Sequence, residues 1–150
     1  MIPMLADRAI DPEAIPWVPQ GDGVWFRPLR FDLSTGTWVN VMRIARGGRI
    51  NRHRHAGGSV TGYVLSGTWR YLERDWVARA GMFVWEPPGD IHTLVVEEGE
   101  EMRTLFQVSG ILQYLDDADR VVGHDDVFTK LARYQYWCRT AGIAEIDLCY

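Results

Sequence analysis

Three of the chain's four histidines occur in two short segments whose spacing suits metal binding. His53 and His55 are separated by one residue, and His92 follows a Pro-Pro-Gly-Asp segment at 87–90. Side chains two residues apart on a strand point to the same side, with their Cα atoms roughly 6–7 Å apart. Two such imidazoles can bind one metal ion, at bonds of about 2.0–2.1 Å, and a third from another strand completes a facial triad. The pattern therefore predicts a metal site inside a β-barrel.

The elements that must position these histidines read as short strands. From residue 24 to about 108, apolar or alternating segments are separated by glycines and charged residues. Residues 60–65 end at a Ser-Gly pair, and 68–72 follow almost at once, a spacing typical of a tight hairpin. Many short strands with regular turn signals favour an all-β sandwich or barrel.

The ends of the chain differ from this central part. Four prolines fall in residues 1–23, and we interpret this segment as an irregular N-terminal arm. Residues 24–110 then form the barrel core, and 111–150 form a C-terminal extension. Within the extension a helix is predicted at about 126–140 and packs on the barrel, because Asp125 and Asp126 can cap it. Its apolar face is formed by residues at helical spacing: Val127, Leu131, Tyr134 and Cys138.

Composition narrows the possible environments and partners. A length of 150 residues suits one domain, and the net charge of -4 without a basic block argues against a nucleic-acid partner. No apolar run has the length of a membrane span, and the first residues lack the layout of a signal peptide. The two cysteines form no disulfide framework. We therefore expect a cytoplasmic protein with reduced thiols and no membrane partner.

The glycines and the proline around the histidines add a family resemblance. The two segments read Gly47-x5-His53-x-His55-x4-Val60-x6-Gly67 and Gly81-x5-Pro87-x-Gly89-x2-His92. In this order they closely resemble the two motifs of the cupin superfamily. The resemblance implies a double-stranded β-helix, or jelly-roll barrel, here with a C-terminal α-helix. It also implies that His53, His55 and His92 are the metal ligands.

One position departs from the family pattern. Cupins typically carry a glutamate ligand where this chain has Val60, and neither Val60 nor the adjacent Thr61 is a good ligand for a divalent metal. Three neutral imidazoles leave the charge of the ion uncompensated, so a three-histidine centre favours an anionic chelating ligand such as an enolate. It also leaves positions free for substrate and dioxygen.

Three segments resemble one particular group of enzymes within the cupins. Residues 62–73, 85–96 and 123–130 are similar to 2,4′-dihydroxyacetophenone dioxygenases, and the likeness covers about 24–142. Those enzymes resemble acetylacetone-cleaving dioxygenases, which also use a three-histidine iron. This implies an Fe(II)-dependent oxidoreductase of aromatic degradation. It would insert both atoms of dioxygen across a C–C bond next to a carbonyl, in a hydroxyacetophenone- or β-diketone-like substrate.

No residue is assigned as catalytic from the sequence. Thr61, Glu86 and Gln107 lie on or beside predicted core strands and are candidates for orienting the imidazoles. Aromatic residues in the same strands are candidates for the wall of the substrate pocket: Tyr63, Trp69, Tyr71 and Trp85. Iron is the expected metal, and zinc, nickel or copper stay open because imidazole suits all of them.

Two other functions stay open. A non-catalytic zinc-binding sensory cupin would act with a DNA-binding or sigma-factor-binding domain, which we do not find in these residues. A metal-dependent isomerase or hydrolase of sugar-like substrates would more naturally keep the glutamate that Val60 replaces. For the dioxygenase the partners are a small-molecule substrate and dioxygen. We also expect a homodimer or homotetramer, because an open sheet edge needs cover.

Overall fold

The computed structural model describes residues 6–150, so Pro3 of the predicted arm lies outside the described residues. A 3-10 helix, η1 (Pro12–Ala14), precedes the strands, and one α-helix, α1 (Val127–Ala141), follows them. The strands in chain order are β1 (Val18–Gly21), β2 (Val24–Asp32), β3 (Thr37–Ala45), β4 (Arg49–Ala56), β5 (Val60–Ser66), β6 (Thr68–Tyr71), β7 (Val77–Arg79), β8 (Phe83–Glu86), β9 (Ile91–Val95), β10 (Glu101–Ser109), β11 (Ile111–Leu115) and β12 (Val121–Asp125).

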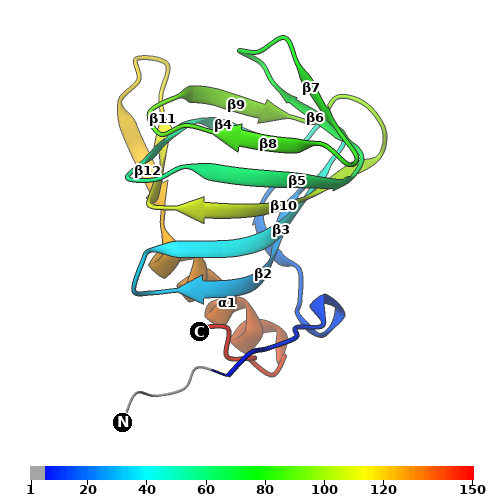
Figure 1. Ribbon diagram of the computed structural model, residues 1–150, viewed down its shortest axis with the longest axis vertical. Coiled ribbons are helices and arrows are strands. Elements are labelled where there is room, and N and C mark those ends of the chain that lie inside the picture. Colours follow the sequence, from blue (N-terminus) through cyan, green and yellow to red (C-terminus); the bar gives the residue numbers. More distant parts are fainter. Residues whose placement is uncertain (1–5) are drawn as a thin grey trace.

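The strands form two six-stranded antiparallel sheets (Figure 1). The first sheet has the order β1-β2-β3-β10-β5-β8, and the second has the order β12-β11-β4-β9-β6-β7. Consecutive strands often change sheet, as from β8 in the first to β9 in the second. This arrangement confirms the predicted all-β jelly-roll barrel with a C-terminal helix.

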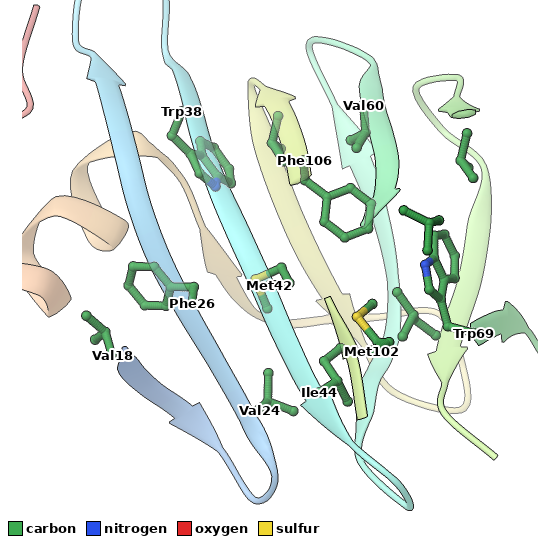
Figure 2. Packing of buried hydrophobic residues seen from close by; sticks show 14 of the residues in the cluster. Val18, Val24, Phe26, Trp38, Met42, Ile44, Val60, Trp69, Met102 and Phe106 are labelled. Carbon is green, nitrogen blue, oxygen red and sulfur yellow. The ribbon is translucent and has the colours of Figure 1, made fainter. Parts of the chain in front are cut away.

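The core lies between the sheets, where alternate residues of each strand point inward. Trp38 and Met42 of β3 and Met102 and Phe106 of β10 extend from the first sheet into this space (Figure 2). Gly62 on the neighbouring strand β5 makes room for the Phe106 ring, because a Cβ at that position would lie 2.8 Å from it. The absence of a side chain there lets a large aromatic ring fill the barrel.

The barrel extends beyond the predicted core of residues 24–110. Strand β1 lies in the predicted arm but pairs with β2 in the first sheet. Strands β11 and β12 lie in the predicted C-terminal extension but belong to the second sheet, where β11 pairs with β4. The sequence did not predict these strands, because β1 is short and β12 contains polar residues.

Helix α1 begins and ends one residue later than the predicted range of about 126–140. The side chain of Asp126 accepts hydrogen bonds from the backbone N–H groups of Phe128 and Thr129, and Gly142 ends the helix with a positive φ of 66°. The helix packs near β1 and β2 at one end of the barrel (Figure 1). None of the described helices has the length and apolar character that crossing a membrane requires.

Candidate metal centre

The three motif histidines meet on the inner face of the second sheet. His53 and His55 lie on β4, and His92 lies on the adjacent strand β9 in direct register with His53. All three side chains are buried. One ring nitrogen from each lies within 4.8 Å of the others, so the three imidazoles can bind one metal ion.

Neighbouring groups hold two of the imidazoles in place. The Nδ1–H of His53 donates to the carbonyl oxygen of Asn51 over 2.7 Å. A carbonyl oxygen only accepts hydrogen bonds, so this contact places the proton on Nδ1 and leaves the lone pair on Nε2 for a metal. The ring of Tyr71 stacks on His92, with centroids 4.0 Å apart and planes 10° apart.

The protonation of the histidines also suits a metal. Burial lowers the pKa of His53 to about 4 and that of His92 to about 3, and burial likewise lowers the pKa of His55. The imidazoles are therefore neutral near pH 7, the form that binds metals. Nδ1 of His55 and both ring nitrogens of His92 have no hydrogen-bond partner among the described residues. Buried polar atoms usually have partners, so these nitrogens fit a metal site.

A carboxyl group from the opposite sheet lies beside the three histidines. The Glu86 side chain places its oxygens 3.4 Å from Nε2 of His55 and 3.6 Å from Nε2 of His92. Glu86 is the last residue of β8, and the following turn is tied to β4 by a 2.7 Å hydrogen bond from Gly89 N–H to the His55 carbonyl oxygen. The Pro-Pro-Gly turn thus brings the end of one sheet to the histidines of the other.

These separations are close to those of atoms that share a metal. Two donors that bind one ion at about 2.1 Å and at the tetrahedral angle lie about 3.4 Å apart. Burial, and secondly the charge of Asp90, raises the pKa of Glu86 to about 8, and a bound divalent cation would favour its ionised form. The three-histidine cluster is as predicted, and the Glu86 carboxyl group lies beside it. Val60 pairs directly with Glu86, so the carboxylate is one strand away from the position expected of a cupin.

Two predicted orienting residues lie away from the centre. Thr61 of β5 pairs with Gln107 of β10 and with Trp85 of β8, in a row next to the one that contains Val60 and Glu86. Because successive residues of a strand point to opposite faces, this row faces outward. Of the three candidates, only Glu86 contacts the imidazoles.

The predicted aromatic wall is also divided. Tyr63 and Trp85 were expected to line the pocket, but they are 48% and 58% exposed on the outer face of β5 and β8. Trp69 is buried in the core, where its indole N–H donates to the Thr104 hydroxyl over 2.9 Å and links the two sheets. Of the four predicted wall residues, only Tyr71 lines the cavity beside the histidines. Aromatic content alone could not distinguish the two faces of a strand.

The cavity beside the histidines has a volume of about 60 Å³ and a mainly apolar wall. Besides His53, His55 and Glu86, three polar residues line it that sequence analysis did not identify: Gln20, Asn40 and Lys130. Asn40 interrupts the inward-facing apolar residues of β3, and Lys130 interrupts the apolar face of α1. These residues could have been found in the sequence as polar residues at positions that the periodicity of the strand or helix assigns to the core.

Known structures resemble the whole chain. An RmlC-like cupin protein from Ralstonia eutropha JMP134 shares 32% sequence identity over 97% of this chain and 96% of its own, with a TM-score of 0.91. The acetylacetone dioxygenase of Acinetobacter johnsonii shares 17% identity over 91% of this chain and 95% of its own, with a TM-score of 0.75. At that identity the second likeness concerns the fold.

A shorter region matches a protein of another kind. In the complex of Rhodobacter sphaeroides SigE with the anti-sigma ChrR, the similarity covers 64% of this chain and 49% of the other. The two share 24% identity, and the TM-score is 0.55. No curated protein matches the sequence. The family model for ChrR cupin-like domains matches residues 5–113, which is most of the chain. The protein therefore belongs to the family of ChrR cupin-like domains.

Proposed function

We propose that this cupin is a non-haem Fe(II) dioxygenase that cleaves a C–C bond next to a carbonyl group. The observation that carries the proposal is the set of three neutral, buried imidazoles with Glu86 beside them, two of which, His53 and His55, line a mainly apolar cavity. The similarity of the fold to an acetylacetone dioxygenase over nearly the whole chain supports it. When bound, a divalent iron would supply a Lewis acid for the carbonyl substrate and a means of activating dioxygen.

The protein's own residues prepare the site in three ways. The Asn51 carbonyl fixes the tautomer of His53, and Tyr71 restricts the rotation of His92 by stacking. With a divalent cation bound, Glu86 would ionise and offset part of the charge of the ion. Apolar side chains such as Val60 and Phe106 limit the water in the cavity, which strengthens electrostatic interactions there.

The cavity has room for a small molecule. Its volume of about 60 Å³ is several times the roughly 10–15 Å³ that one water requires, which suits a short β-dicarbonyl compound. Tyr63 and Trp85 lie on the outer face, and the aromatic part of the wall is formed by Trp38, Tyr71 and Phe106.

Oxygen consumption tests the proposal. Protein loaded anaerobically with Fe(II) should take up dioxygen when acetylacetone or a related short dicarbonyl is added. With labelled dioxygen, each of the two product fragments should carry one labelled atom. Zinc-loaded protein and His92→Ala are the matched controls and should consume none. Absence of uptake across a panel of dicarbonyls and hydroxyketones, with full iron loading, refutes the dioxygenase.

A second function is favoured by the position of Glu86. Three imidazoles and one carboxylate make four donors, and four protein ligands are typical of closed structural zinc sites. The similarity to part of the anti-sigma protein ChrR is consistent with a non-catalytic zinc-binding sensor. This alternative predicts that zinc is retained during dialysis against a chelator and that the iron-loaded protein consumes no dioxygen.

A further inference from the structure

Asn40 is a polar side chain placed where the fold calls for an apolar one. It lies between Trp38 and Met42 on the inward face of β3, is 1% exposed and lines the cavity that contains the histidines. Neither Nδ2 nor Oδ1 of Asn40 has a hydrogen-bond partner among the described residues. Leaving a buried amide unpaired is unfavourable, so the position of Asn40 fits a polar group bound in the cavity.

Lys130 brings a positive charge to the same cavity from helix α1. It is 3% exposed, its Nζ donates to the side-chain oxygen of Gln20, and it lies 4.2 Å from the centroid of the Phe26 ring. Within the described residues no carboxylate lies within 4.0 Å of this ammonium, and Asp125, whose charge acts on Lys130 from farther away, accepts from Tyr114 and Thr129. A buried ammonium with no carboxylate in direct contact favours an anionic ligand.

Both residues lie over the β2–β3 part of the first sheet. Asn40 is on β3, and the Lys130 ammonium lies over Phe26 of β2, the cross-strand partner of Met42. Met42 and Asn40 are two residues apart on β3, so they share a face at roughly 6–7 Å between Cα atoms. Asn40 and Lys130 both line the cavity, together with His53, His55 and Glu86.

We propose that Asn40 and Lys130 bind the carboxylate of a short 3-oxo acid, whose carbonyl end lies toward the histidines. Nδ2 of Asn40 and Nζ of Lys130 would each donate to the carboxylate, a charge-assisted arrangement that a neutral diketone cannot match. The proposal rests on the proposed metal-dependent function, and it replaces the diketone by an acid of the same size.

Two probes of equal size test this specificity. Acetoacetate and acetylacetone have the same number of non-hydrogen atoms, but only acetoacetate has a carboxylate in place of one acetyl group. Titration calorimetry on the zinc-loaded protein measures binding without turnover. We expect wild type to bind acetoacetate at least about tenfold more tightly than acetylacetone, since hydrogen bonds to charged groups are among the stronger ones. Equal affinity for the two probes overturns the proposal without any variant.

Variants then identify the residues. Lys130→Met and Asn40→Leu should each weaken acetoacetate binding by about tenfold and leave acetylacetone binding within about threefold. Arg139→Met, which removes an exposed charge from the same helix, is the matched control and should change neither. Lys130→Gln serves if the methionine variant does not fold. Unchanged acetoacetate binding in the folded variants contradicts the assignment.

The outcome separates this proposal from the proposed function. If zinc binds in a one-to-one ratio and neither probe binds, the carboxylate site fails while the metal centre stands. If acetoacetate binds as expected but the iron-loaded protein consumes no dioxygen, the dioxygenase fails and the carboxylate site stands. If zinc itself does not bind, the shared basis of both is refuted.

Discussion

The carboxylate of Glu86 lies 3.4 Å from Nε2 of His55, although the two residues belong to different sheets. The contact depends on the turn after β8, which crosses between the sheets and is tied to β4 through Gly89. Glu86 and Val60 are direct cross-strand partners facing the cavity. A carboxyl group from β8 therefore lies beside the three-histidine site, where β5 carries Val60.

Removing this carboxylate should weaken metal binding. Glu86→Gln keeps the shape of the side chain but removes the charge, so the affinity for zinc or iron should fall about 10–100-fold. Competition with a chromogenic chelator measures the change. The exposed Glu98 gives the matched control, because Glu98→Gln should leave the affinity unchanged.

Exchanging the cross-strand partners tests the geometry itself. The double variant Val60→Glu with Glu86→Val moves the carboxylate one strand across the cavity. We expect it to bind metal within about tenfold of wild type, and more tightly than Glu86→Val alone. If the double variant is no better than the single one, the carboxylate at position 86 acts by something other than its charge near the imidazoles.

His92 should be essential for the metal and dispensable for the barrel. His92→Ala removes one of three imidazoles, and metal affinity should drop by more than about 100-fold, beyond the loss of a residue that only orients a ligand. The far-ultraviolet circular dichroism should stay close to that of wild type. His124→Ala removes a half-exposed histidine outside the cluster and should retain the metal. Stoichiometric metal in His92→Ala would refute the triad.

The cavity wall can be distinguished from the outer face with two aromatic substitutions. Tyr71 is buried and stacks on His92, so Tyr71→Leu should reduce both the free energy of unfolding, by about 1–3 kcal/mol, and metal affinity. Trp85 is largely exposed, and Trp85→Ala should change stability by less than about 1 kcal/mol and metal affinity not at all. Denaturant unfolding with and without zinc measures both effects. A loss of metal affinity in Trp85→Ala would place that indole at the site after all.

Lys130 should give the protein a stability that depends on pH. Burial lowers its pKa from 10.5 to about 8, against the opposing effect of Asp125, while Arg133 lowers it further. Between pH 8 and 10.5 the unfolded chain binds a proton that the folded protein has lost, so this residue makes stability rise with pH in that window.

The change attributable to Lys130 amounts to about 3 kcal/mol at most, and comparison with Lys130→Met isolates it. Urea unfolding of both proteins at pH 7, 9 and 10.5 should show wild type gaining stability relative to the variant as pH rises. A difference that stays constant over this range would mean that the ammonium is not desolvated in the folded protein.

The sequence predicts the parts of this site that are encoded locally. The metal ligands follow from the spacing of the histidines, the flanking glycines and Pro87. The C-terminal helix follows from its capping residue and its apolar face. These features depend on strand alternation and on capping, which act over a few residues.

Other parts depend on register between distant strands, which the chain order does not reveal. The contact of Glu86 with His55 follows from a change of sheet, and the inward direction of Asn40 follows from its place in β3. Tyr63 and Trp85 face outward, although aromatic residues like these often line ligand pockets. The sequence could not assign faces in strands where both sides carry apolar residues.

Anomalous diffraction from crystals of the Fe(II)-loaded protein, recorded at the iron edge, tests the metal centre most directly. The account predicts one strong peak at bonding distance from a ring nitrogen of each of His53, His55 and His92, on the side that faces Glu86. A peak elsewhere, or none at full iron loading, would contradict it.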